Sequence, residues 1–133
     1  MRDRRRPRRL TVDETTAYLW TVRHAHGDGE PCREILTLLR DGVRTRIVFR
    51  EGRGRYVGSG YPSHSGGVGD ARHHLNLHEP GVVRALLDEA RRRGLLSSSR
   101  ELDGWELLPA AAAAVSRRAA ATPEAPPDCP PDP

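Results

Sequence analysis

Residues 33–50 read REILTLLRDGVRTRIVFR, and this stretch predicts a β-hairpin. Residues 33–39 and 43–50 alternate like strands, and Asp41-Gly42 between them is a pair that favours a two-residue hairpin turn. Such a turn fixes the register, because a slip of one residue would move every side chain to the other face. The expected core face pairs Leu38 with Thr45, Leu36 with Ile47, and Glu34 with Phe49.

The opposite face of this hairpin is apolar in its middle and basic around it. It pairs Leu39 with Arg44, Thr37 with Arg46, Ile35 with Val48, and Arg33 with Arg50. Like charges directly opposite each other are unfavourable, so the last pair predicts an anion or a carboxylate between its arginines. An apolar centre with an arginine rim is typical of a protein contact. The candidate partner- or anion-binding residues are therefore Arg33, Arg44, Arg46, Arg50, Ile35, Leu39 and Val48.

Three other interpretations of this face stay open. The anion could be a nucleic-acid phosphate, since Arg53 and Arg55 extend the basic array. The face could instead be solvated and neutralised by carboxylates such as Asp41 and Glu51. Finally, the glycine-rich loop or the alanine-rich segment could cover it within the monomer.

The rest of the chain predicts short strands and one helix. In residues 18–22, Tyr18, Trp20 and Val22 alternate onto one face, as in a half-buried strand. Shorter strands are expected at 10–12, 56–57 and 75–77, a loop at 58–70, and a closing hairpin or returning strand at 100–107 with its turn at Asp103-Gly104.

Residues 80–93 have the features of a helix. Pro80 suits the first position, arginines fill the last turn, and Gly94 suits the position just beyond the end. The apolar stripe of Val83, Leu86, Leu87 and Ala90 is expected to pack against Leu36, Leu38, Ile47 and Phe49, with Trp20 and Trp105 bordering that core. The predicted fold class is α+β, with an antiparallel sheet of four to six strands and one helix packed across one face.

The predicted organisation is one domain between two tails. Residues 1–9 form a basic arm, residues 10–109 the α+β domain, and residues 110–133 an alanine-rich and then proline-rich tail, frayed or disordered. All 22 basic residues of the 133-residue chain are arginine, and its net charge is +4. The arm holds six of these arginines and one aspartate, so the remaining chain is nearly neutral. The basic composition is therefore a property of the arm and only weakly suggests a nucleic-acid partner.

The cysteines and the hydropathy indicate a reducing, aqueous compartment. Cys32 and Cys129 form neither a disulfide framework nor a CxxC pair. No apolar run approaches the ~20 residues of a membrane span, and acidic Asp13 and Glu14 follow the arm where a signal peptide would be apolar. We expect a cytoplasmic protein that contacts no membrane.

Two histidine groups have spacings that occur in metal sites. His24, His26 and Asp28 match H-x-H-x-D, but a strand end running into a turn explains that spacing equally. His73, His74 and His78 are weak metal candidates, because solvated histidines beside a short strand explain them. A metal-dependent enzyme would require the two groups to converge.

The other catalytic patterns are missing. The glycines of residues 58–70 lack the spacing of a phosphate-binding loop followed by a helix, and no G-x-S-x-G sequence supplies a serine nucleophile. We therefore predict no cofactor and no catalytic residue.

Three stretches carry a resemblance: LTVDETTAYLWTV at 10–22, EPGVVRALLDEARRRG at 79–94 and DGWELL at 103–108. They resemble a recurring class of small, uncharacterised α+β proteins of high-GC bacteria over most of residues 10–108. The resemblance implies a compact α+β fold and brings no activity with it.

These observations favour a small non-catalytic binding or interaction module. A protein partner or self-association is expected to use the sheet face of Ile35, Leu39 and Val48 with its arginines. The alternative is a nucleic-acid-associated protein held by the basic arm and by Arg44, Arg46 and Arg50.

Overall fold

A computed structural model describes residues 6–25, 29, 31–58 and 66–121. It confirms the α+β class, with a five-stranded mixed sheet, a three-stranded sheet and two helices. The larger sheet has the order β1-β2-β3-β4-β8. Its strands are β1 (Arg8–Asp13), β2 (Thr16–Ala25), β3 (Arg33–Arg40), β4 (Val43–Arg50) and β8 (Arg100–Asp103).

The hairpin of β3 and β4 has the predicted register throughout. Leu36 lies opposite Ile47 on one face, and Ile35 lies opposite Val48 on the other. Asp41 and Gly42 have φ angles of 53° and 79°, the positive values that a tight hairpin turn requires. The local sequence therefore determines the centre of the sheet.

The expectation of an entirely antiparallel sheet is wrong at one edge, because β8 runs parallel to β4. Helix α1 (Pro80–Arg92) lies between these two strands in the chain. A helical crossover returns the chain to the end of the sheet from which it left, and the next strand then runs parallel.

The expectation of a single helix is also wrong. Asp103-Gly104 does not form a hairpin turn; it starts α2 (Gly104–Ala121), which crosses Pro109, where the sequence predicts the domain to end. The Asp103 carboxylate accepts a hydrogen bond from the Trp105 backbone N–H at 3.0 Å, which is the role of a helix N-cap. Gly104 is required here because a Cβ would lie 2.5 Å from the Phe49 ring.

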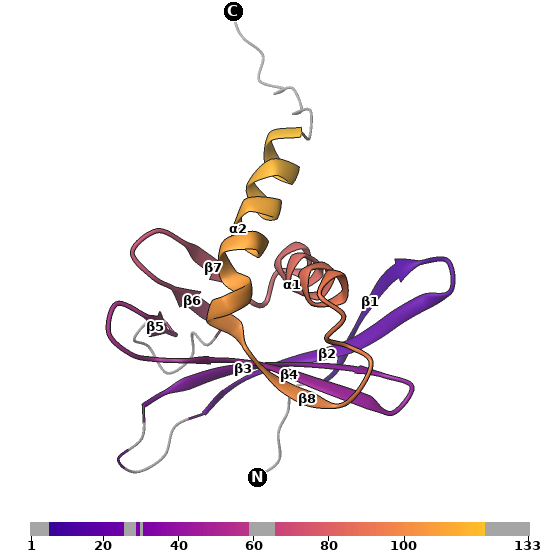
Figure 1. Ribbon diagram of the computed structural model, residues 1–133, viewed down its shortest axis with the longest axis horizontal. Coiled ribbons are helices and arrows are strands. Elements are labelled where there is room, and N and C mark those ends of the chain that lie inside the picture. Colours follow the sequence, from indigo (N-terminus) through magenta and orange to yellow (C-terminus); the bar gives the residue numbers. More distant parts are fainter. Residues whose placement is uncertain (1–5, 26–28, 30, 59–65, 122–133) are drawn as a thin grey trace, which may run out of the picture.

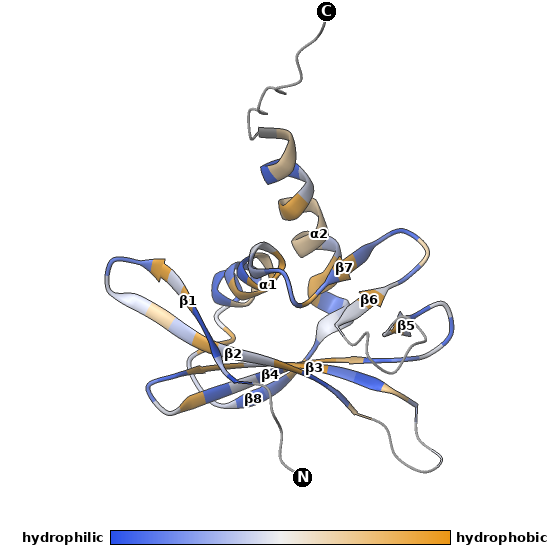
Figure 2. Ribbon diagram, turned by 180° about the vertical axis from the view of Figure 1, so that it is seen from behind, coloured by the Kyte–Doolittle hydropathy of each residue, from blue (hydrophilic) through white to orange (hydrophobic). Residues whose placement is uncertain are grey.

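Both helices lie on one side of the larger sheet (Figure 1). The predicted stripe of α1 is buried together with Leu36, Leu38, Ile47 and Phe49, and Trp20 and Trp105 belong to the same core. Helix α2 adds Leu107, Leu108 and Ala111. Figure 2 shows the same arrangement from behind, with apolar and polar segments alternating along the strands of the larger sheet.

The smaller sheet lies on the same side as the helices. It is antiparallel and consists of β5 (Tyr56–Val57), β6 (Gly67–Gly69) and β7 (His74–Asn76). Val57, Val68 and Leu75 connect it to the core. No helix in the described ranges is long and apolar enough to cross a membrane.

Candidate interaction surface

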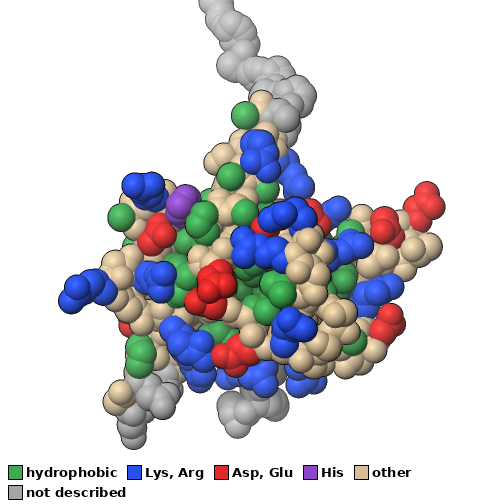
Figure 3. Space-filling view, viewed as in Figure 1, with side chains coloured by type: hydrophobic (Ala, Val, Ile, Leu, Met, Phe, Trp, Pro, Cys, Tyr) green, Lys and Arg blue, Asp and Glu red, His purple; other side chains and the backbone are tan. Residues whose placement is uncertain are grey.

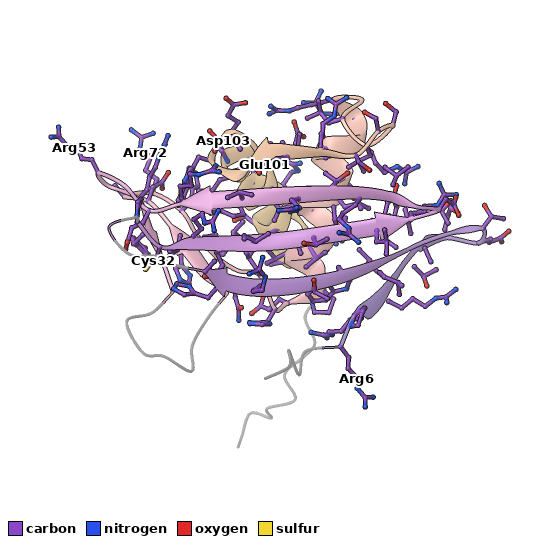
Figure 4. The ribbon with its side chains drawn as sticks, turned by 90° about the horizontal axis from the view of Figure 1, so that it is seen from below. Arg6, Cys32, Arg53, Arg72, Glu101 and Asp103 are labelled. Carbon is purple, nitrogen blue, oxygen red and sulfur yellow. The ribbon has the colours of Figure 1, made fainter. Side chains whose placement is uncertain are left out.

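One face of the larger sheet is left open by both helices and by the smaller sheet, as far as the described residues show. Figure 4 views the molecule from this side, with the strands in front of the helices. Strand pairing identifies the side chains that share the face, because alternate residues point the same way. We call it the arginine face; it comprises Arg9, Leu19, Thr21, Arg23, Arg33, Ile35, Thr37, Leu39, Arg44, Arg46, Val48, Arg50, Glu101 and Asp103.

The apolar centre of the arginine face is mostly covered. Ile35 and Val48 are each only 2% exposed, although neither belongs to the core cluster on the helix side. On this face Arg23 lies directly opposite Ile35, and Arg33 and Arg50 are the next residues along β3 and β4. Their long aliphatic stems suit such a cover. The apolar surface offered to a partner therefore comes from Leu19, which is 41% exposed, and from half-buried Leu39.

The carboxylate of Glu101 lies beside the predicted pair of arginines. Arg33 and Arg50 lie opposite each other, and the Arg50 guanidinium donates to Glu101 Oε2 at 2.7 Å. That hydrogen bond is the main cause of the lowered pKa of Glu101, and the charges of Arg50, Arg46 and Arg33 add to it. The face therefore already holds one carboxylate among its arginines. Figure 4 shows Glu101 and Asp103 along the β8 edge.

In the part of the chain that the structure describes, the other arginines of the face have no such ion pair, although Arg46 lies directly opposite Glu101 in the pairing of β4 with β8. Within the described ranges, no ion pair is found for Arg9, Arg23, Arg44 or Arg46. Arg44 and Arg46 are exposed. Arginine side chains follow the lower margin of the molecule, where the sheet lies, with few acidic ones among them (Figure 3). Among the described residues, Arg9, Arg23 and Arg44 therefore carry positive charge that no ion pair neutralises, and this half of the face is basic.

A shallow pocket of about 330 Å³ lies in the same half. Thr21 and Thr37, which are direct cross-strand neighbours, sit between the Leu19–Leu39 row and the Arg23 row. Threonine hydroxyls and guanidinium groups both donate hydrogen bonds, whereas the leucines offer apolar contact. The residues around the pocket are Pro7, Leu19, Trp20, Thr21, Arg23, Thr37, Leu39, Arg44 and Arg46.

Half of this pocket was not predicted from the sequence, although a signal was present. The alternation that buries Tyr18, Trp20 and Val22 necessarily turns the residues between them to the other face. Asp28-Gly29 favours a turn between β2 and β3, but the connection is too long to fix their register. Leu19, Thr21 and Arg23 could therefore not be matched to Thr37 or Arg44 from the sequence.

The predicted histidine groups form no metal site in the described part of the chain. His74 stacks near Tyr56, and His73 Nδ1 lies 3.3 Å from the Asp70 carboxylate. No group of three or more metal-binding side chains is found among the described residues. His26 and Asp28 lie outside those residues.

A buried carboxylate lies on the core side, where the predicted hairpin register places Glu34 opposite Phe49. Glu34 is fully buried, and its two oxygens bond to His24 Nδ1 at 2.6 Å and to the Gly66 N–H at 2.5 Å. Burial raises the pKa of Glu34, and the bonds to His24 and Gly66 oppose that shift. His78 adjoins this group, because a Cβ on Gly66 would lie 2.8 Å from its Nε2 atom. Glu34 thereby connects β2 and β3 to the start of the smaller sheet.

No protein-family model, curated protein or solved structure matches this chain. Its function must therefore be inferred from the geometry of its surfaces. Of these surfaces, the arginine face is covered by neither helix, is rich in arginine and holds a pocket.

Proposed function

We propose that this protein is a non-catalytic interaction module that binds an acidic protein surface through its arginine face. The proposal rests on the hydrogen bond from Arg50 to Glu101 at 2.7 Å. The positive charges of Arg33 and Arg46 also act on this carboxylate. A partner carboxylate placed over the pocket would meet similar chemistry at Arg23 and Arg44, with Arg46 between the pocket and Glu101.

The composition of the pocket supports a protein partner. Leu19 and Leu39 offer apolar contact in the centre, and the arginines surround them, as in a protein interface with an apolar core and a polar rim. Arginine is enriched in such interfaces because its planar guanidinium pairs bidentately with carboxylates.

One observation favours the alternative of a nucleic-acid partner. Pro7 lines the pocket, so the arginine-rich N-terminal segment of the sequence adjoins the arginine face at this residue. Against it, Glu101 and Asp103 would repel phosphates along the β8 edge. No aromatic side chain that could stack on a base is exposed on the described part of this face.

A binding comparison tests the proposal. The probe is a fluorescein-labelled peptide of alternating glutamate and alanine, here called the Glu-Ala peptide, and a matched Lys-Ala peptide is the charge control. Fluorescence anisotropy should show binding of the Glu-Ala peptide alone, weakening as salt rises from about 50 to about 500 mM because the charges are screened. A short DNA duplex serves as the competitor.

Two outcomes would count against the proposal. Failure of the Glu-Ala peptide to bind at low salt would remove the acidic partner. A duplex that binds more tightly than the peptide, and that loses its binding when Arg44 and Arg46 are reversed to glutamate, would make nucleic acid the partner of this face.

A further inference from the structure

The last residues of the chain repeat an acidic pattern that complements the arginine face. Residues 124–132 read EAPPDCPPD, in which a carboxylate recurs every fourth residue at Glu124, Asp128 and Asp132. Residues 122–133 contain no basic residue. This segment, which lies outside the described residues, is therefore an acidic, proline-rich peptide joined to a domain with an unoccupied basic face.

The chain leaves the domain on the side away from the arginine face. Helix α2 rises from the sheet on the opposite side in Figures 1 and 2. Its residues 116–120 are all exposed, so its last turns project beyond the core. With 18 residues, α2 is about 27 Å long.

The length of the acidic segment decides which copy of the face it can reach. At full extension, about 3.6 Å per residue, the seven residues from Ala121 to Asp128 span at most ~25 Å. That is less than the length of α2, so Glu124 and Asp128 cannot return even to the near side of their own sheet. Asp132, eleven residues from Ala121, has a longer reach of at most ~40 Å. For Glu124 and Asp128, the arginine face beyond that sheet is within reach on a second copy of the chain.

The spacing of the carboxylates also suits the face. Four residues of a polyproline segment span about 12 Å. On β2, Leu19 and Arg23 are four residues apart, which is about 13 Å along a strand. Two carboxylates that bracket a pair of prolines can therefore lie over the two ends of the pocket, near Arg44 and Arg23. The prolines between them then lie over Thr21 and Thr37, next to Leu19 and Leu39.

We infer that residues 122–133 of one copy bind the arginine face of a second copy, so that the chain self-associates through its acidic repeat. The inference rests on the proposed function, since it names a second copy of this chain as the acidic partner. Apolar proline rings and regularly spaced carboxylates match the leucines and arginines that line the pocket.

The experiment compares the oligomeric state of four full-length chains by sedimentation velocity at low salt, with a reductant present so that Cys32 and Cys129 remain thiols. The wild-type chain should associate as its concentration rises. The variant E124Q/D128N/D132N and the variant R44E/R46E should both remain monomeric. The variant R53E/R72E, which reverses two exposed arginines away from the face, should still associate.

A synthetic peptide of residues 122–133 provides the second measurement. Its affinity for the E124Q/D128N/D132N chain should fall at least about tenfold when R44E/R46E is added, because glutamates then face its carboxylates. A wild-type chain that stays monomeric and does not bind this peptide would overturn the inference. If the Glu-Ala peptide nevertheless binds, the proposed function stands and only its partner is different.

Discussion

Replacing Trp105 with alanine is expected to lower the free energy of unfolding by about 3–5 kcal/mol, the range for a buried aromatic truncated to alanine. The Trp105 ring packs edge-on against Phe49, with ring centroids 5.2 Å apart and an interplanar angle of 89°. Its indole N–H donates to the Arg50 carbonyl at 2.8 Å. Through these two contacts, Trp105 connects the start of α2 to the end of β4. Chemical denaturation with a two-state fit measures the loss.

The variant Trp105→Phe is the matched control. It keeps an aromatic ring beside Phe49 and removes the indole hydrogen bond, so its loss should be about 1 kcal/mol. An alanine variant within 1 kcal/mol of the wild type would show that the junction of β8 and α2 is held by other contacts. In that case Trp105 would not be the residue that holds β8, and with it Glu101, beside β4.

Reversing Arg44 and Arg46 together to glutamate is expected to weaken binding of the Glu-Ala peptide by at least about tenfold. Both side chains are exposed and line the pocket, so the change places two negative charges where the proposal puts the partner's carboxylates. Like charges brought together at an interface are strongly unfavourable. Fluorescence anisotropy at constant salt measures the two dissociation constants.

The control R53E/R72E makes the same change in net charge elsewhere on the surface. Arg53 and Arg72 project from the end of the molecule that carries the smaller sheet (Figure 4). If both double variants weaken the peptide equally, net charge alone causes the binding and the arginine face is not a site. A thermal melt of each variant checks that the fold is retained.

The centre of the sheet was predictable because its determinants are adjacent in the sequence. Asp41-Gly42 fixes the turn, the turn fixes the register, and the register separates the core side of Leu36 and Ile47 from the arginine face. Helix α1 was equally predictable from its end signals and its apolar stripe.

The edges of the fold depend on contacts that a single sequence does not display. Asp-Gly is a signal for a hairpin turn, yet aspartate is also a strong helix N-cap, and at Asp103 the N-cap is what forms. The hairpin register predicted a carboxylate between Arg33 and Arg50. It did not predict Glu101, which follows Arg50 by 51 residues and reaches it through a parallel pairing of β4 and β8.

The candidate surface was therefore predictable in its central hairpin and not in its flanks. Leu39, Arg44 and Arg46 were expected from the hairpin alone. Leu19 and Arg23 join them only because β2 pairs with β3. The seven residues between these strands, 26–32, include the turn signal Asp28-Gly29, but a connection of that length does not fix the register.

In the most direct test of the central claim, the isotopically labelled protein is titrated with the Glu-Ala peptide, and NMR spectra record its backbone amide chemical shifts. The proposal predicts that the perturbed amides cluster on β2, β3 and β4 around the pocket, at residues such as Thr21, Thr37 and Arg44. Peptide binding that perturbs instead the smaller sheet of β5, β6 and β7, and leaves those strands unchanged, would contradict it.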